Sequence, residues 1–369
     1  MTLINGLTRR LAAGIAAITI GGSLAVAAAG TAQAAIPDHW GFAYVNNPAV
    51  PGVPVLAHQA GSWPAGVVQV KPGAIGQVFV RFPKIASSGG VVLVTAVTAR
   101  PAWCQAQKWG PSGLAEEVAV RCFLAGGTPI FVPFTVLYSQ SSAGPIGPGR
   151  AYGYVHFSLP HAVVARFNSA GAVNTVAAVA TGVWTVRMPG LGSAAQAGNV
   201  QVTAVNAVVP AKCEIGQWHS APGGQLIQVR CFDKLATPMN TGWTLTYQRG
   251  RAVTGKQPKR FAYTFDNKPL VPGPYAPAPA GVNFNSAGGV NNVRTAGGGL
   301  RLVTIPRVGA LPDTVLVTTS GSGGRFCNLL SPWFTSPAAA VVTVRDVACY
   351  TATGALKNTA ALITYTAAH

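Results

Sequence analysis

Ile227-Gln-Val-Arg-Cys231 is a short run in which apolar and polar side chains alternate up to a cysteine. Successive side chains of a β-strand point to opposite faces, so Ile227, Val229 and Cys231 fall on one side of the strand. The earlier run Val118-Ala-Val-Arg-Cys122 has the same pattern. Two unrelated segments rarely share such a pattern. The sequence therefore predicts a strand whose cysteine faces a core, and it predicts this strand in more than one copy.

Four marker residues, Cys, Trp, Cys and Tyr, recur three times in this order. The interval from the second cysteine to the tyrosine is identical in all three copies. The intervals between successive first cysteines are far longer than a solenoid unit, so each copy is predicted to be a domain with a small core of its own. The markers are Cys104, Trp109, Cys122 and Tyr138, then Cys213, Trp218, Cys231 and Tyr247, then Cys327, Trp333, Cys349 and Tyr365.

The six cysteines permit 15 pairings, and the repeat selects one bridge per copy. Each bridge closes a loop of roughly 20 residues and adds about 3 kcal/mol by the loop-entropy model. The predicted disulfides are Cys104–Cys122, Cys213–Cys231 and Cys327–Cys349. Because the cysteines are widely spaced and histidine is scarce, we predict no metal site and no cofactor.

Other short segments align between the copies. Each copy contains a Val-x-Val-Thr strand, namely Val92 to Thr95, Val200 to Thr203 and Val315 to Thr318. The copies open on Gly41-Phe-Ala-Tyr-Val45, Ala151-Tyr-Gly-Tyr-Val155 and Arg260-Phe-Ala-Tyr-Thr264, which aligns Tyr44 with Tyr154 and Tyr263. Short strands divided by Gly, Pro, Ser and Asn turns predict an all-β fold. We expect three tandem antiparallel β-sandwiches, immunoglobulin-like or jelly-roll-like, with one disulfide each.

Composition sets the limits of the sandwiches at residues 36–138, 151–247 and 260–369. The Ser-, Gly- and Pro-rich stretch 139–150 is a predicted linker. The second linker, 248–259, is basic and carries Arg249, Arg251, Lys256 and Lys259. A solvated spacer and a basic clamp on a polyanion both fit this second linker. We expect both linkers to be flexible joints between separate modules.

Residues 1–34 have the features of an export signal. Arg9 and Arg10 precede an apolar run, and Ala32-Gln-Ala34 is a small-residue cleavage site. We predict cleavage after Ala34 and an extracellular protein, in contact with the cell wall or released. An uncleaved membrane anchor is the alternative, although the run is rich in Gly and Ala and therefore weakly hydrophobic. No later segment is predicted to span a membrane.

The predicted mature chain is a polycation. Without Arg9 and Arg10 it keeps 24 of the 26 basic residues against eight acidic ones, a net charge of +16. Such a charge favours encounter with acidic polymers. Five tryptophans lie outside the marker pattern and are the aromatic side chains freest to face a ligand: Trp40, Trp63, Trp103, Trp184 and Trp243. Burial is the commoner fate of tryptophan, so we expect one or two of the five to be exposed. The three marker tryptophans are expected to pack in the core against the bridges.

Two stretches share an Asn-Ser-Ala-Gly string, Phe167 to Asn174 and Phe284 to Asn291. Asn and Ser bond their own backbone, and Gly tolerates positive φ, so the string is typical of a tight hairpin turn. The alternative is a loop that offers amides to a ligand such as a sugar. The first copy has Gly61-Ser-Trp-Pro there instead.

The sequence does not predict an enzyme. Hydrolysis by paired carboxylates needs two acids across one bond, whereas the eight acids are spread over three domains with no position filled in all three. Glu116 and Glu117 are adjacent strand residues that point to opposite faces. No Gly-x-Ser-x-Gly elbow surrounds a serine. If the chain were a hydrolase, His219 beside Trp218 would be the first candidate for its base.

The pieces Gly41 to Val45, Val92 to Ala96, Val120 to Phe123 and Phe134 to Tyr138 resemble units of exported tandem-repeat proteins of Gram-positive actinobacteria. The resemblance covers residues 36 to 369 and implies export and a tandem-repeat architecture, but no activity. Those units have an acidic residue between the Val-Arg-Cys-Phe strand and the last strand. This chain departs from the pattern with Pro129-Ile-Phe-Val and Pro238-Met-Asn-Thr, so a role for that acid does not carry over.

Together these features predict a secreted, non-catalytic, multivalent binding protein for acidic cell-wall or extracellular polymers or glycans. Linked weak sites gain affinity through effective concentration. Sequence-independent, salt-sensitive binding to polyanions, DNA included, is also expected. Two alternatives stay open. One is a structural cell-surface or spore-coat component that self-associates through strand edges, and the other is a secreted hydrolase. The oligomeric state is not predicted.

Overall fold

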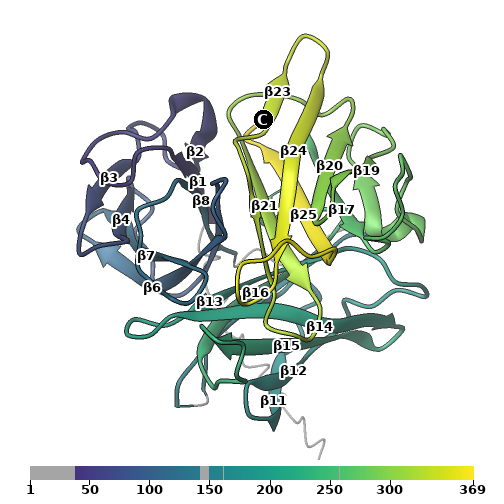
Figure 1. Cartoon of the computed structure of the whole chain (residues 1–369), viewed down its shortest axis with the longest axis horizontal. Coiled ribbons are helices and arrows are strands. Elements are labelled where there is room, and N and C mark those ends of the chain that lie inside the picture. The colour runs from purple at the N-terminus through teal and green to yellow at the C-terminus, as the bar shows by residue number, and fades with distance from the viewer. Residues whose placement is uncertain (1–37, 142–148, 161, 257) are drawn as a thin grey trace, which may run out of the picture. The chain divides into compact units, whose positions relative to one another are not determined.

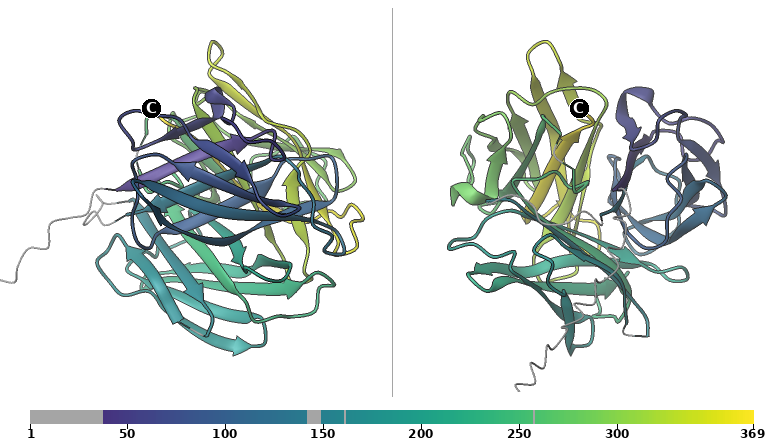
Figure 2. Two further views of the ribbon diagram at one scale, coloured as in Figure 1. Left: turned by 90° about the vertical axis from the view of Figure 1, so that its left-hand side faces the viewer. Right: turned by 180° about the vertical axis from the view of Figure 1, so that it is seen from behind.

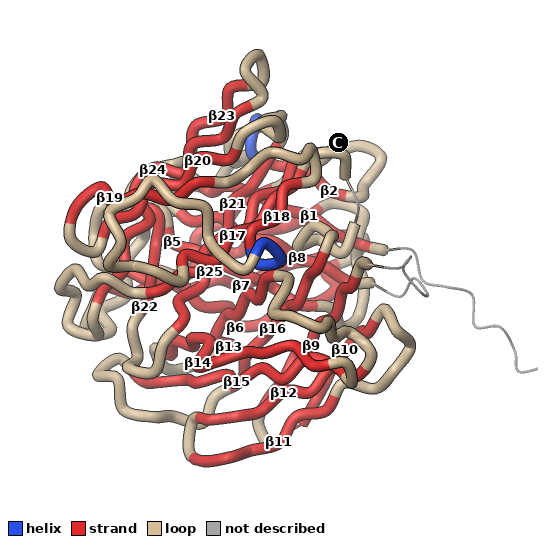
Figure 3. The backbone as a smooth tube through the Cα atoms, turned by 90° about the vertical axis from the view of Figure 1, so that its right-hand side faces the viewer, coloured by secondary structure: helices blue, strands red, loops and turns tan. Residues whose placement is uncertain are grey.

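β-Strands make up nearly all of the regular structure (Figure 3). The computed structural model describes residues 38–141, 149–160, 162–256 and 258–369. The only helices in these residues are two single 3₁₀ turns, Leu56–His58 and Ala280–Val282. The predicted all-β fold is thereby confirmed. The predicted signal peptide, its cleavage site after Ala34 and the stretch 142–148 of the first linker lie outside the described residues. No helix in the described part of the chain is long and apolar enough to cross a membrane.

Repeat 1 (36–138, purple to blue in Figure 1) contributes two antiparallel sheets with strand orders β2-β1-β8-β5 and β6-β7-β4-β3. Side chains of both sheets share one apolar core. The strands are β1 (His39–Val45), β2 (Gln59–Gly61), β3 (Gln69–Pro72), β4 (Gln77–Phe82), β5 (Val91–Ala96), β6 (Ala102–Ser112), β7 (Ala115–Leu124) and β8 (Phe134–Gln140).

Repeat 2 (151–247, teal) has the same topology, with strand orders β10-β9-β16-β13 and β14-β15-β12-β11 around its own core. Its strands are β9 (Ala151–Ser158), β10 (Ala162–Asn168), β11 (Thr175–Ala180), β12 (Val183–Pro189), β13 (Asn199–Val205), β14 (Ala211–Ala221), β15 (Gly224–Asp233) and β16 (Gly242–Arg249). Strand β8 runs to Gln140 and β16 to Arg249, slightly past each predicted repeat end.

Repeat 3 (260–369, green to yellow) has the orders β18-β17-β25-β21 and β19-β20-β24-β22, with β23 also paired to β24. Its strands are β17 (Phe261–Asp266), β18 (Asn283–Asn285), β19 (Asn292–Gly297), β20 (Leu300–Ile305), β21 (Asp313–Ser320), β22 (Phe326–Leu329), β23 (Phe334–Ser336), β24 (Val341–Tyr350) and β25 (Ala360–Ala367). The three described repeats are thus two-sheet sandwiches of one topology.

The predicted disulfides are confirmed. Each bridge joins two neighbouring antiparallel strands at directly opposed positions: Cys104–Cys122 on β6 and β7, Cys213–Cys231 on β14 and β15, and Cys327–Cys349 on β22 and β24. The marker tyrosines are fully buried on β8, β16 and β25. Their hydroxyls bond loops between strands, as Tyr247 does by donating to the Ala197 carbonyl at 2.9 Å.

The opening strands align differently from the sequence prediction. The marker tyrosine of each repeat lies opposite Gly41, Gly153 and Ala262 respectively. Phe42, and not Tyr44, is therefore the counterpart of Tyr154 and Tyr263. The predicted alignment of repeat 1 is wrong by two positions. A shift of two leaves every side chain on the same face of the strand, so the sequence pattern contains no sign of it.

The sheets continue from one repeat into the next. A parallel bridge joins β13 to β6 and another joins β14 to β21, which produces two eight-stranded sheets (Figure 2). A third parallel bridge joins repeats 3 and 1. The bridged pairs occupy equivalent positions: Val205 with Ala106, Ser320 with Ile215, and Val97 with Leu329. We call this arrangement the closed cycle. The described residues of all three repeats belong to one compact unit, so the expectation of separate modules is wrong for this part of the chain.

Candidate functional site

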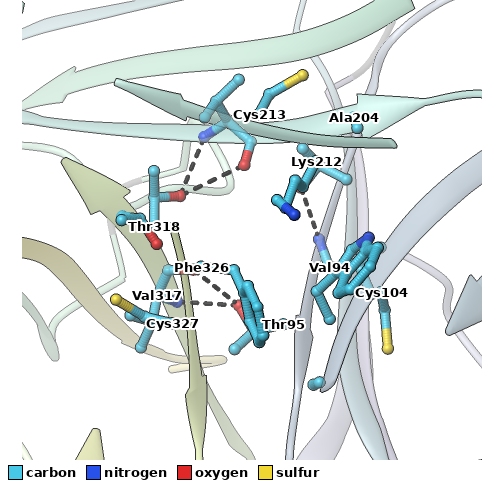
Figure 4. A pocket seen from close by; sticks show the side chains of 15 residues that line it. Val94, Thr95, Cys104, Ala204, Lys212, Cys213, Val317, Thr318, Phe326 and Cys327 are labelled. Carbon is cyan, nitrogen blue, oxygen red and sulfur yellow. Dashed lines mark hydrogen bonds between the residues drawn. The ribbon is translucent and has the colours of Figure 1, made fainter. Parts of the chain in front are cut away.

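The three Val-x-Val-Thr strands bond one another around the closed cycle (Figure 4). The Val94 amide of repeat 1 donates to Thr203 Oγ1 of repeat 2 at 3.0 Å. The equivalent bonds run from Val202 to Thr318 at 3.1 Å and from Val317 to Thr95 at 3.0 Å. A sandwich strand commonly has one face in water. Here both faces of β5 are buried, because its outer face packs against the other repeats.

A polar residue directly after the first cysteine of each bridge bonds the loop backbone of the following repeat. Glu214 accepts hydrogen bonds from the amides of Gly324 at 3.1 Å and Arg325 at 3.2 Å. Burial raises the pKa of Glu214 to about 7, against the effect of these amides. The counterparts of Glu214 are Gln105, which donates to the Asn206 and Val209 carbonyls, and Asn328, which donates to the Arg100 and Ala102 carbonyls.

The residue before that cysteine differs in each repeat, being Trp103, Lys212 and Phe326. These side chains line a central cavity of about 40 Å³ together with the threonines (Figure 4). Lys212 Nζ lies 4.8 Å from the centre of the Trp103 ring and 5.7 Å from that of Phe326. Burial lowers the pKa of Lys212 to about 8. The cavity has room for a few water molecules and not for a sugar, so we interpret Lys212 as part of the packing between repeats.

A second hollow lies on the surface where repeats 2 and 3 begin. We call it the basic groove. It has a volume of about 550 Å³ and is lined by Gly149, Arg150, Gly250, Pro258, Lys259, Phe261, Phe284 and Ser286. Arg150 and Lys259 are both exposed. They occupy equivalent positions, each shortly before the aligned aromatic residues Tyr152 and Phe261. The closed cycle thus brings two cationic side chains from different repeats to one groove.

The aromatic wall of the basic groove is rigidly held. The ring centres of Phe261 and Phe284 lie 5.4 Å apart in a stacked arrangement. Tyr263, two residues after Phe261 on β17, also stacks on Phe284, with a distance of 5.3 Å between the ring centres. Ser286 Oγ accepts from the Phe261 amide and donates to the Lys259 carbonyl, each at 2.9 Å. Lys259 therefore projects from an anchored backbone beside a partly exposed Phe284 ring.

A smaller pocket of about 210 Å³ shares Pro258 with the basic groove. Trp40 and Lys256 line it. Lys256 Nζ lies 3.5 Å from Asp38 Oδ2, so part of its charge is balanced by an acid. The basic groove and this pocket are lined in part by residues of the predicted basic linker, among them Lys256 and Lys259.

The linker itself packs as part of the fold. Ala252, Val253 and Thr254 are buried, and Val253 joins an apolar cluster with Trp40, Phe42, Leu93, Leu137 and Leu316. Arg251 is half-buried and donates to the Gly255 carbonyl, and Arg249 is a half-buried residue of β16. A solvated spacer is therefore excluded for these residues. Of the four predicted basic residues, Lys259 lines the basic groove and Lys256 the pocket beside it.

Most of the five variable tryptophans do not face solvent. Trp103, Trp184 and Trp243 are buried, with exposed fractions of 4%, 1% and 0%. The prediction that they face a ligand is wrong for these three, because each fills a space within or between sandwich cores. Trp63 is half-buried against Phe82. Trp40 retains 9% exposure and is the one that lines a surface pocket.

The marker tryptophans share core clusters with the bridges, as predicted. They also reach the next repeat in the closed cycle. The ring-centre distances are 4.2 Å from Trp109 to His156, 6.2 Å from Trp218 to Phe265, and 5.9 Å from Trp333 to Tyr44. Burial lowers the pKa of His156 to about 4. Each marker tryptophan therefore packs against a bridge and against a neighbouring repeat.

The Asn-Ser-Ala-Gly string joins strands of two different sheets, β10 to β11 and β18 to β19, so the hairpin interpretation is wrong. The turn chemistry is present, since Gly171 and Gly288 have φ of 74° and 71°. The buried amides are used within the fold: Asn174 Nδ2 donates to the Tyr154 and Phe167 carbonyls, as Asn291 does to those of Tyr263 and Phe284.

The acidic side chains also serve structural contacts. Asp266 pairs with Arg301 at 2.8 Å, both buried. Glu117 lies 3.7 Å from Arg81, and Asp233 accepts from two amides of its own turn. Glu116 is buried and accepts from the Ser87 amide, while burial raises its pKa to about 7. His219 is exposed on β14, apart from these acids in the described contacts. No paired-carboxylate geometry arises from the described contacts.

The sequence predicts only some of the residues that line the basic groove. Lys259 belonged to the predicted basic linker, but Arg150 and Phe284 lie far from Lys259 in the sequence and were not predicted. The common position of Arg150 and Lys259 ahead of aligned aromatic residues was the available signal. No protein family model, no curated protein and no solved structure matches the chain. Function is therefore inferred from the residues alone.

Proposed function

We propose that the chain is a secreted, non-catalytic protein that binds acidic extracellular or cell-wall polymers through the basic groove. The observation that carries this proposal is the pairing of Arg150 and Lys259 beside the partly exposed Phe284 ring. Cations attract the acid groups of a polymer, and an aromatic face packs on the apolar face of a sugar ring. The net charge of +16 adds attraction at longer range.

The closed cycle changes the expected mode of binding. The position of Arg150 and Lys259 is occupied in repeat 1 by Asp38, an acid paired with Lys256. The three repeats therefore do not offer three equal sites on flexible arms. We propose one groove at the junction of repeats 2 and 3 in place of three independent binding modules.

The test is retention of the chain from Ala35 onward on immobilised polygalacturonate, with dextran as the neutral control. Lys259→Glu is expected to lower retention at least about fivefold, because it reverses a charge in the groove. Lys357→Glu changes the net charge equally on an exposed residue of repeat 3 and is expected to have an effect below about twofold.

Two results would contradict the proposal. Equal retention on polygalacturonate and dextran at low salt would exclude acidic polymers as the target. Equal losses in Lys259→Glu and Lys357→Glu would show that diffuse charge, and not the groove, holds the polymer. Phe284→Ala then separates stacking from charge, because its effect persists at high salt, where screening weakens the ionic contacts.

A further inference from the structure

The outermost strand of each disulfide-containing sheet is β3 in repeat 1, β11 in repeat 2 and β19 in repeat 3. Loop residues of the same chain pair with two of these edges, Gly52 with Val70 of β3 and Tyr275 with Val293 of β19, whereas β11 forms no such bridge among the described residues. An unpaired edge presents free amides and carbonyls to any other strand, and proteins protect such edges with charges, prolines or bulges. The three edges can be compared residue by residue, because Val70, Val176 and Val293 pair with the equivalent residues Val80, Val186 and Val303.

The next position along the edge carries a charge in two of the three repeats. It is Lys71 in β3 and Arg294 in β19, both exposed, but Ala177 in β11. Strand β3 also ends at Pro72. Strand β11 reads Thr175-Val-Ala-Ala-Val-Ala180, with no charge and no proline. Of the three edge strands β3, β11 and β19, only β11 lacks a charged side chain.

The surroundings of β11 are apolar as well. Val179 is 59% exposed, Val173 before the strand is 56% exposed, and Val164 on β10 is 53% exposed. Strand β10 is the outer edge of the other sheet of repeat 2. Both outer edges of this sandwich thus expose valine, a residue of high β-propensity.

We infer that β11 is the site at which a second copy of this chain docks, by antiparallel pairing of the two β11 edges about a twofold axis. Such an interface is self-complementary, because the same edge serves both partners. It would also extend a sheet that already crosses between repeats, since β11 ends an eight-stranded sheet that a parallel bridge between repeats 2 and 3 builds.

Electrostatic repulsion between two copies favours pairing through β11 over pairing through β3 or β19. Two copies with a net charge of +16 repel each other, and pairing β3 or β19 would bring Lys71 or Arg294 of both copies into one short interface. It would also displace Gly52 or Tyr275, which already pair with these strands. Like charges directly opposite each other destabilise a strand pair. Pairing through β11 avoids this repulsion. The register shift between Ala178 and Ala180 limits regular pairing to Thr175–Ala178, so we expect a weak, reversible dimer.

Sedimentation of the chain from Ala35 onward, over a range of concentrations at low and high salt, tests this inference. We expect a monomer–dimer equilibrium that strengthens with salt, because screening reduces the repulsion between copies. Ala177→Lys introduces the charge that the equivalent position has in β3 and is expected to weaken dimerisation at least about tenfold. Ala177→Glu should weaken it too, since it brings two like charges into the same short paired segment.

Ala338→Lys, at the exposed tip between β23 and β24, is the matched control and should dimerise like the parent chain. A parent chain that stays monomeric at the highest concentration in both salts would overturn the inference, as would dimers that Ala177→Lys and Ala177→Glu leave unchanged. The outcome is independent of the proposed function, because binding to an acidic polymer weakens with salt whereas this dimer strengthens.

Discussion

His58 Nδ1 of repeat 1 lies 2.6 Å from Asp313 Oδ1 of repeat 3, although the two residues are 255 positions apart in the sequence. Asp313 is fully buried. Its Oδ1 also accepts from Trp333 Nε1 at 2.9 Å, and its Oδ2 accepts from the Thr335 hydroxyl. One carboxylate therefore holds a marker tryptophan in place and ties the last repeat of the chain to the first.

Asp313→Ala is expected to lower the free energy of unfolding by about 3 to 5 kcal/mol, because it leaves the buried Trp333 Nε1 and the part-buried Thr335 hydroxyl and His58 without their partner. Urea denaturation measures this change. Glu117→Ala is the control, since its contact with Arg81 is partly exposed and is worth less than about 1 kcal/mol. Equal losses in the two variants would contradict a special role for Asp313.

Thr203→Val tests the threonine bonds of the closed cycle. The substitution keeps the shape of the side chain but removes the acceptor of the buried Val94 amide, and we expect a loss of about 1 to 3 kcal/mol. Calorimetry should show one unfolding transition for both chains, because the repeats share sheets. Separate transitions for the repeats would contradict a cooperative closed cycle. Thr353→Val, on an exposed turn, should be within about 0.5 kcal/mol of the parent chain.

Glu116 gives the chain a defined dependence on pH. Its pKa is about 7 in the folded state against 4.5 for an unperturbed glutamate, so the folded chain binds more protons between these values. Stability from this group is present below about pH 4.5 and is lost as the pH rises to 7. The parent chain should lose on the order of 3 kcal/mol of stability from this group between about pH 4.5 and 8, and Glu116→Gln should abolish this loss. Glu117→Gln is the neighbouring control, and an identical pH profile for parent and Glu116→Gln would refute this assignment.

Lys212 makes the stability of the chain depend on pH in the opposite direction. Its pKa falls from 10.5 to about 8 on folding, so the unfolded chain binds more protons between pH 8 and 10.5 and stability rises across that interval. Lys212→Met removes the buried charge and keeps an unbranched, slightly shorter side chain. We expect it to be neutral or to stabilise the chain by about 1 to 3 kcal/mol at about pH 7. A clear destabilisation in urea would show that the cation between Trp103 and Phe326 is favourable.

Period-2 alternation around Cys122 and Cys231 was enough to predict these strands. The recurrence of the marker residues selected the disulfides, and the short strands with their turns predicted the sandwiches. The same alternation could not reveal the shift of Phe42 against Tyr154. It also did not reveal that the outer faces of the Val-x-Val-Thr strands are buried, because threonine suits both solvent and a hydrogen-bonded interior. The basic groove was half predicted through Lys259. Its other half, Arg150 and Phe284, depends on how sheets from separate repeats join, and no local pattern encodes that.

The three different side chains at the central cavity have a consequence for how this protein can evolve. A ring of three identical subunits would repeat any substitution there threefold, and a single lysine would become three ammonium groups in close contact, which repel one another. A single polypeptide is free of that restriction. Covalent linkage thus allows each copy to change independently at its centre, so that one cation lies between two aromatic rings.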